Sequence, residues 1–448
     1  MLLFVCILKF LCAIMTRIEG IMENTQEKMQ ENSQINPQKP KKNLNSSTYN
    51  LLACHGLNLA VAVFVSTFLV SHIYSYSSNY LVDIGLFYVF NYLAMGILYP
   101  IVSYFLDRTN RVSIYRFAIV IRGAFIVSLV FFGNEIAKFV ILAGVLHGMS
   151  EAFYWTSYNV MKSELVSCCL TNKYSTIQVV ENKLINFIVP IVLGGVIDSS
   201  SFIISSFIIF AVVIVQLIIS IFIKSRRPLN SSFDMKKFVK DIKASPQRKD
   251  IYKTIFIISM INGFHAVVSS LNTILIMLVF KSNFSLGVLT GIFSGISILI
   301  LLFIKRFVKT GKRLPLYISL VILSIISMTI VPFFMSKTLV VIYNFIYMFA
   351  AIVYSYMFDF YRNCFVKKFD MYDDIAEYQC IIESILQIAR VFIYAIMIGV
   401  GLIGASFGAN GLLFTLKIFF AACSIIYVFY NIMLYVCEKK FIKYKILE

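Results

Sequence analysis

The chain alternates long hydrophobic blocks with short polar segments over most of its length. Each block exceeds the roughly 18 apolar residues that indicate a membrane-spanning helix. In lipid, every backbone N–H and C=O must be bonded within its own segment, so an isolated apolar block has to be a helix. The pattern predicts an all-α integral membrane protein with twelve transmembrane helices, near residues 51–76, 82–105, 113–133, 138–160, 177–197, 201–223, 254–279, 285–304, 314–335, 338–361, 380–403 and 412–436.

Composition agrees with this class, because 59% of the 448 residues are hydrophobic and 14% are charged. The net charge of +18 would suit a nucleic-acid-binding protein, but its distribution does not. Of the 40 Lys and Arg residues, 33 fall in the two tails and in alternate loops, and only Lys138, Lys281 and Lys337 fall in the opposite loops. The positive-inside rule therefore places both termini in the cytoplasm of a multi-pass protein of the cell membrane. No nucleic-acid partner is expected.

The pattern divides the chain into five parts. Residues 1–47 form an N-terminal tail that is disordered or interfacial, because its apolar start is too short to span and residues 22–47 are rich in Gln, Asn, Lys and Pro. Residues 48–224 and 254–437 each hold six spans, and 438–448 form a cytoplasmic tail. The basic linker 225–253 can be a solvated connection or an amphipathic helix on anionic headgroups, since Phe238-Val239 lies among spaced lysines.

The second half repeats the first at a near-constant offset. Glu181-Asn-Lys-Leu matches Glu383-Ser-Ile-Leu at an offset of 202, and His55-Gly-Leu-Asn58 mirrors Asn262-Gly-Phe-His265 at 207. Same-sense repeats of six spans joined by a long loop are a design of membrane transporters. The repeat therefore favours a transporter.

One loop carries a recognisable motif, Ser103-Tyr-Phe-Leu-Asp107-Arg108-Thr-Asn110-Arg111. It resembles the loop between the second and third helices of major facilitator superfamily transporters of the bacterial, twelve-helix type, although Ser103 and Asn110 stand where glycines are usual. The resemblance implies that spans 1, 4, 7 and 10 line a central cavity. It also implies that Asp107, Arg108 and Arg111 help to close the cytoplasmic side. The span 5 signature of drug–proton antiporters is altered around Pro190, which argues against that subgroup.

Charges inside the spans are the strongest functional signal. An ionised group in mid-bilayer costs from about 3 to well over 10 kcal/mol unless it is paired or hydrated. Arg122, Glu151 and Arg390 fall deep in their predicted spans. Four others are expected close to an interface, where they can snorkel or pair, namely Glu181, Lys183, Glu383 and Lys417.

Helical spacing places His147, Glu151, Tyr154, Tyr158 and Lys162 on one face of span 4. Glu151 is the predicted proton-coupling residue, with His147 one turn away and Arg122 at similar depth on the adjoining helix. A permanent Glu151–Arg122 ion pair that only ties spans 3 and 4 together is the alternative. The full set of pathway candidates is His147, Glu151, Arg122, Trp155, Asn58, Asn262, His265, Tyr354 and Arg390, and the cytoplasmic gate candidates are Asn159, Lys162, Asp359 and Arg362.

The sequence thus predicts a secondary active transporter of a small solute that works by alternating access with proton coupling. It is expected to act as a monomer without cofactor, metal or catalytic residues. The alternative is a lipid-modifying or lipid-handling membrane protein on the same scaffold, although no catalytic triad, metal spacing or P-loop is present. Arg122 and Arg390 could favour an anionic substrate, but Glu151 and its neighbours could also occupy them. Substrate and transport direction are not encoded in any motif.

Overall fold

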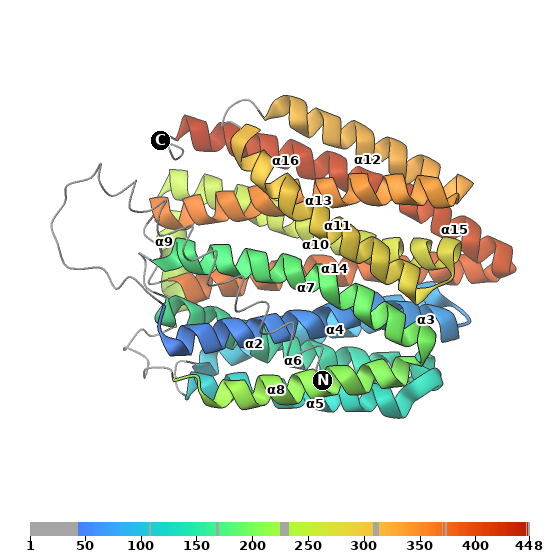
Figure 1. Ribbon diagram of the computed structural model, residues 1–448. Coiled ribbons are helices and arrows are strands. Elements are labelled where there is room, and N and C mark those ends of the chain that lie inside the picture. Colours follow the sequence, from blue (N-terminus) through green and yellow to red (C-terminus); the bar gives the residue numbers. More distant parts are fainter. Residues whose placement is uncertain are drawn as a thin grey trace.

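The computed structural model describes residues 44–106, 109–166, 170–224, 233–307, 313–369, 371, 374–444 and 446. The described chain is helical throughout, and the helices run side by side in one bundle (Figure 1). In order they are α2 (Ser46–Val63), η1 (Phe64–Leu69), α3 (Val70–Tyr76), α4 (Tyr80–Leu106), α5 (Arg111–Phe132), η2 (Gly133–Glu135), α6 (Ile136–Leu165), α7 (Thr171–Ser199), α8 (Phe202–Ile221), α9 (Met235–Ala244), α10 (Pro246–Phe280), α11 (Asn283–Phe307), α12 (Leu314–Phe334), α13 (Lys337–Lys368), α14 (Ile375–Ser406), α15 (Gly408–Ala422) and α16 (Ser424–Lys443).

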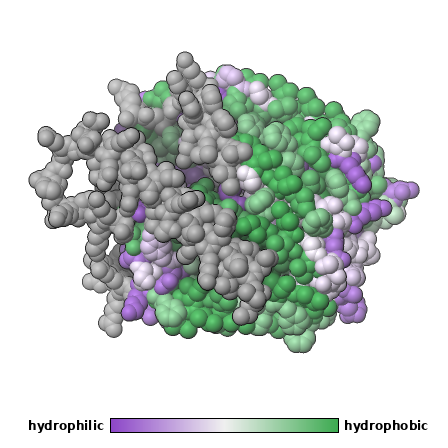
Figure 2. Space-filling model, viewed as in Figure 1, coloured by the Kyte–Doolittle hydropathy of each residue, from purple (hydrophilic) through white to green (hydrophobic). Residues whose placement is uncertain are grey.

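Twelve crossings follow from these helices. Ten stretches of the described chain are long and apolar enough to span a membrane, one of which holds both α5 and α6, and α11 adds a shorter apolar stretch over Asn283–Ser297. The first crossing combines α2, η1 and α3, while the last combines α15 and α16. Figure 2 shows a hydrophobic band across the middle of the molecule and hydrophilic residues toward its right-hand end. The predicted twelve-helix membrane fold is confirmed.

Many helices extend beyond the predicted spans. α7 begins at Thr171, six residues before the apolar block, and α13 continues to Lys368. A helix of 30 residues is about 45 Å long, whereas the hydrocarbon core is about 30 Å thick, so the ends reach polar surroundings. N-cap side chains define where several of the helices begin. Asn110, which replaces a glycine of the family motif, accepts a hydrogen bond from the backbone N–H of Val112 at 3.1 Å and so caps α5.

The linker contains the predicted amphipathic helix, α9. Its apolar residues Phe238 and Ile242 are buried, and α9 packs on α10 and α14. The backbone N–H of Asp234, its N-cap, donates to Glu377 of α14 at 2.9 Å. The apolar side of α9 is therefore covered by protein, which corrects the expectation that it lies on headgroups. We call the end of the bundle that carries α9 and the end of α16 the α9 face, and the other end the opposite face (Figure 1).

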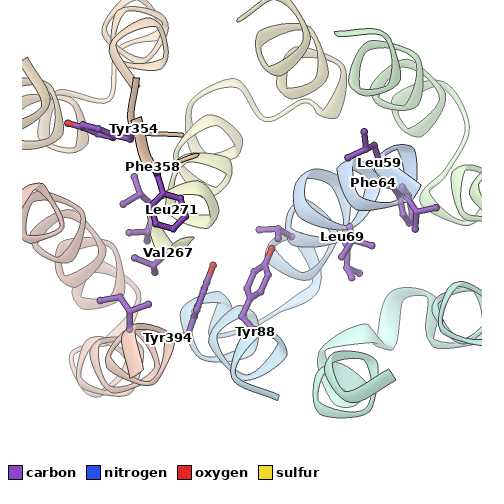
Figure 3. Close-up of a cluster of buried hydrophobic side chains, with 14 of the residues drawn as sticks. Leu59, Phe64, Leu69, Tyr88, Val267, Leu271, Tyr354, Phe358 and Tyr394 are labelled. Carbon is purple, nitrogen blue, oxygen red and sulfur yellow. The ribbon is translucent and has the colours of Figure 1, made fainter. Parts of the chain in front are cut away.

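The first six and last six crossings meet along two helix pairs, α4 with α14 and α7 with α11. Aromatic side chains fill the first pair, where Tyr88 and Tyr394 stack with ring centroids 4.6 Å apart (Figure 3). Glycines permit the second: a Cβ at Gly287 would overlap the carbonyl oxygen of Pro190, and one at Gly291 would lie 2.6 Å from the carbonyl oxygen of Phe187. Small residues at regular spacing allow this close approach of backbones in a membrane.

The two sets of helices are also hydrogen-bonded at the opposite face. Asp198, at the end of α7, accepts hydrogen bonds from the hydroxyl of Ser282 at 2.7 Å and from the backbone N–H groups of Asn283 and Phe284 at 3.0 and 2.9 Å. The carboxylate thus caps the N-terminus of α11, where a negative charge is favourable. This contact must break whenever α7 and α11 separate at this end.

We expect Asp198→Ala to loosen the opposite face. The backbone N–H groups of residues 283 and 284 lose their acceptors, so their hydrogen exchange should become several-fold faster, in line with the loss of about 0.5–2 kcal/mol when a helix cap is removed. Hydrogen exchange with mass spectrometry measures this. Asp83→Ala is the matched control, because Asp83 accepts from Ser77 within its own half. Equal protection of these amides in the Asp198 variant and the wild type would contradict the assignment.

Candidate functional site

The centre of the site is an ion pair between α5 and α6. Arg122, which is completely buried, donates from Nη2 to Oε1 of Glu151 at 2.7 Å. The indole Nε1 of Trp155, one turn further along α6, donates to Oε2 of Glu151 at 2.7 Å. Both oxygens of the carboxylate are therefore engaged. The guanidinium also lies over the ring of Tyr154, with Cζ 4.6 Å from the ring centroid.

The ion pair leaves part of Arg122 unused. Its Nε and Nη1 have no hydrogen-bond partner within the part of the chain that the structure describes. A buried guanidinium with free donors is costly, because each donor has lost its hydration without compensation. These two donors can receive a further acceptor, such as a solute oxygen or a water molecule. The pair is therefore not a closed structural unit.

His147 lies one turn before Glu151 on α6, but its hydrogen bond leads elsewhere. Its Nδ1 lies 2.9 Å from Oδ1 of Asn91 on α4. Because an amide oxygen only accepts, Nδ1 carries the proton in this arrangement. The ring packs against Phe125 at a centroid distance of 5.0 Å. Asn91 thus orients His147, and pattern reasoning along one helix had no means of finding this partner.

A second polar chain runs from the ion pair toward the α9 face. His55 on α2 contacts the hydroxyl of Tyr154 through Nδ1 at 3.0 Å, and its Nε2 lies 3.0 Å from Nε2 of Gln178 on α7. The amide oxygen of Gln178 in turn accepts from Nζ of Lys162 at 2.9 Å. The Gln178 amide donates to Nε2, so the Nδ1–H of His55 donates to the tyrosine. His55 and Gln178 join the candidate residues, although the sequence suggested His55 only as part of a repeat.

In the second half, the candidates gather around His265 of α10. Its Nε2 lies 2.9 Å from the hydroxyl of Tyr427, and its ring stacks on Tyr347 with centroids 6.0 Å apart. The hydroxyl of Tyr354 accepts from Nδ2 of Asn431 at 2.6 Å. The arrangement echoes that of His55 and Tyr154 in the first half. It brings His265 of α10 and Tyr354 of α13 together with Tyr427 and Asn431 of α16.

Three further pathway candidates differ in their surroundings. Asn58 is buried, and neither of its amide atoms has a hydrogen-bond partner among the described residues. Asn262 is half-buried on α10. Arg390 lies over the ring of Tyr92 of α4, with Cζ 4.9 Å from the centroid, and donates to Gln387 at 3.1 Å. Arg390 therefore lies at the contact between the two halves and forms no ion pair with Glu151.

Two charged residues expected near an interface lie against neighbouring helices. Because α7 begins at Thr171, Glu181 and Lys183 follow its start by about three turns rather than two. The carboxylate of Glu181 is buried against Gly56 of α2, and its Oε2 has no hydrogen-bond partner in the described chain. Lys183 lines a partly open cavity of about 240 Å³. The helix extends past the apolar block from which its span was located, and the place of both groups near an interface, where they snorkel or pair, stays a prediction.

The comparisons with known proteins agree with this geometry. The family model of the Major Facilitator Superfamily matches residues 51–373, well over half of the chain. The chain belongs to the major facilitator superfamily. A search of the curated proteins gives no significant match.

Solved structures of major facilitator transporters share the fold at low sequence identity. The peptide transporter POT in complex with sulfate is 14% identical, with a TM-score of 0.62 over 90% of this chain and 97% of that one. The nucleoside transporter NupG is 12% identical, with a TM-score of 0.59 over 87% and 99%. The human organic anion transporter MFSD10 (TETRAN) is 12% identical, with a TM-score of 0.59 over 86% and 98%. At such identities the likeness shows the fold alone.

Membership of the superfamily makes the chain a secondary transporter and sets aside the membrane-enzyme alternative. Of the motif residues expected to close one side, Asp107 and Arg108 lie outside the described residues. Arg111 is buried at the start of α5 and forms an ion pair with Glu164 near the end of α6. The repeat copy, Arg313, lies 3.8 Å from Glu438 of α16. Both arginines thus connect helices of their own half.

The four gate candidates of this transporter lie near the α9 face. Lys162 donates to Gln178, and the Nδ2 of Asn159 lies 3.4 Å from the hydroxyl of Tyr99. In the second half, Arg362 donates to Gln379 of α14 at 2.7 Å, and the side chain of Asp359 is exposed. Each of these three hydrogen bonds stays within one half of the molecule. No group of three or more His, Cys, Asp or Glu side chains that could hold a metal ion occurs in the described residues.

Proposed function

We propose that this major facilitator transporter moves a small solute across the cytoplasmic membrane together with protons, and that Glu151 carries the proton. The observation behind the proposal is the buried contact of Arg122, Glu151 and Trp155. A carboxylate at this depth stays ionised at acceptable cost only while its cation is close. A rocking motion that separates α5 from α6 at this point would make Glu151 take up a proton, and a motion that closes the contact would release it.

The pathway in this proposal passes between the two halves, with both termini in the cytoplasm. His147, Asn58 and Trp155 line it from the first half, and Asn262, His265, Tyr354 and Arg390 from the second. The free donors of Arg122 bind the solute or a water molecule while Nη2 holds Glu151. Asp107, Arg108, Arg111, Asn159, Lys162, Asp359 and Arg362 form the gate on the cytoplasmic side, which is the α9 face.

The test uses Glu151→Gln and needs a solute that a ligand-stability screen on the purified protein supplies. Under the coupling proposal, the variant loses pH-driven accumulation in proteoliposomes but keeps counterflow, because exchange needs no net proton movement. A purely structural ion pair predicts instead that folding yield and both activities fall together. Glu135→Gln is the matched control, since Glu135 is an exposed glutamate that pairs with Lys138 outside the site. If Glu151→Gln loses both pH-driven accumulation and counterflow, or loses neither, the proposal is wrong.

Trp155 gives a second readout that needs no solute. It is the only tryptophan of the chain, and its indole N–H donates to Glu151. Protonation of that carboxylate weakens the hydrogen bond, so the tryptophan emission of the purified protein should change on acidification. Glu151→Gln should abolish this change. A pH-dependent emission that is identical in wild type and variant would show that Glu151 is not the group that takes up the proton.

A further inference from the structure

The cavity beside Lys183 lies between the two halves. It measures about 240 Å³ and lies between α7, α10, α11 and α13. At about 30 Å³ per water molecule, it holds roughly eight waters, or a solute with a similar number of non-hydrogen atoms. None of the pathway residues predicted from the sequence lines it. Its lining residues are Lys183, Asn272, Thr290, Phe293, Ser294, Ser297, Asn344, Tyr347, Met348, Ala351, Ile352 and Ser355.

Charge is the first property of this lining, because Lys183 is its only charged residue. No hydrogen bond or ion pair of the ammonium group is found within the described part of the chain. Lys183 is half-buried, and a partly buried ammonium group is unfavourable without a counter-charge. Lys183 therefore provides a positive charge to whatever enters the cavity.

Hydrogen-bonding groups surround the charge. Asn272 of α10 donates from Nδ2 to Oδ1 of Asn344 on α13 at 2.8 Å, so the two amides form a bridge across the cavity wall. Oδ1 of Asn272 is buried and has no hydrogen-bond partner among the described residues. Buried amide atoms usually find a partner, in the protein or in an ordered molecule. Oδ1 of Asn272 can therefore accept from a donor group of a solute or from water. The hydroxyls of Ser294 and Ser297 donate to the backbone oxygens of Lys183 and Ser294 at 3.4 and 2.5 Å, so they too offer only acceptors.

The rest of the lining is apolar and aromatic. Phe293 and Met348 are buried, and Tyr347 contributes its ring. Small-molecule sites combine such an apolar wall with a few polar groups that fix the orientation of the ligand. A ring or short chain with one acidic group matches this distribution better than a polyanion, because only one cation is present.

Access to the cavity follows one face of α13. Ala351, Ser355 and Asp359 recur at intervals of four residues, and the side chains of Ser355 and Asp359 are exposed. Residues four apart lie one above the other on a helix, so this row leads from the cavity toward the α9 face. A solute could therefore reach the cavity from that side.

We propose that this cavity is the binding site for a small organic monocarboxylate, with Lys183 as its counter-charge. The carboxylate of the solute binds the ammonium group of Lys183, which is the charged donor of the lining. The apolar body of the solute packs on Phe293 and Tyr347. The assignment deepens the proposed transport function by naming the class of solute. Binding itself does not depend on the proposed function, but transport of the bound solute does.

Benzoate and benzamide are suitable probes, because they have the same shape and differ in charge. The unfolding midpoint of the purified protein is measured against the concentration of each, since a ligand that binds only the folded state raises it. We expect benzoate to stabilise the wild type and benzamide to do so at least tenfold less effectively. Inorganic phosphate in place of benzoate tests the other source of negative charge. Stabilisation by phosphate alone, or by benzamide as strongly as by benzoate, would overturn the assignment.

Lys183→Met removes the charge and should weaken benzoate binding about tenfold or more. Lys417→Met is the matched control, because Lys417 also lies in a membrane helix, α15, but does not line the cavity. Ala351→Leu keeps the lysine and fills the cavity, so it too should abolish the benzoate effect. Unchanged benzoate binding in both cavity variants would place the site elsewhere.

Failure of this proposal is separable from failure of proton coupling. Glu151→Gln leaves every lining residue of the cavity in place. It should therefore keep benzoate-dependent stabilisation even where pH-driven accumulation is lost. Benzoate binding with no pH-driven transport would reject the coupling alone, whereas coupling without benzoate binding would reject the monocarboxylate site alone.

Discussion

Replacing Arg122 by methionine should lower the free energy of unfolding by about 3–5 kcal/mol, the usual cost of leaving one charge of a buried pair without its partner. Glu151 would then face Trp155 alone, because the 2.7 Å contact to Nη2 is the ion pair that compensates its charge. The stacking of the guanidinium on Tyr154 would also be lost. The thermal unfolding midpoint in detergent and the yield of monodisperse protein measure the effect.

The double variant Arg122→Met/Glu151→Gln is the control that separates charge from packing. Removing both charges of a buried pair is often neutral, so most of the lost stability should return. If the double variant is as unstable as Arg122→Met, the single loss came from the volume and stacking of Arg122, and the ion pair is not what requires it. The comparison of these single and double variants also bears on function, because proton coupling needs an ion pair that can open without unfolding the protein.

The hydrophobic pattern was sufficient for the membrane fold, and the reason is physical. Lipid requires each crossing to satisfy its own backbone hydrogen bonds, so each apolar block is an independent signal. The ends of helices carry no such signal, since a helix that leaves the lipid can continue through polar residues. For this reason the predicted span began near residue 177 although α7 begins at Thr171, and the pattern gave no sign that Lys183 lines a cavity.

The site was predictable only where a single helix or a neighbouring pair carries it. Arg122 and Glu151 stand out because charges in lipid are rare and because consecutive helices run antiparallel. The partners of His55 could not be found in this way. Tyr154 and Gln178 are 99 and 123 residues away in sequence, and no periodicity tells which faces of α2, α6 and α7 meet. Tertiary packing decides these contacts, as it does that of His147 with Asn91.

Gly287→Ala should have the second large effect on stability, because it adds a methyl group at the contact between the two halves. The new Cβ would overlap the carbonyl oxygen of Pro190, which is backbone and cannot turn aside. The overlap forces α7 and α11 apart along their whole glycine row and also strains the cap that Asp198 forms on α11. Overpacking of this kind typically costs about 1–3 kcal/mol. The unfolding midpoint should fall, and the amides at the start of α11 should exchange faster.

Gly399→Ala is the same substitution in another membrane helix, α14, and its Cβ would meet nothing within 4 Å. Alanine is the better helix former by roughly 1 kcal/mol, so this variant should be as stable as the wild type or more so. The comparison therefore isolates the steric effect from helix propensity. The two halves of a transporter must move relative to each other, so the close backbone contact of α7 with α11 serves motion as well as packing. If both variants have the same unfolding midpoint, the contact of α7 with α11 is loose enough to accept a methyl group, and the glycines do not limit the approach of the two halves.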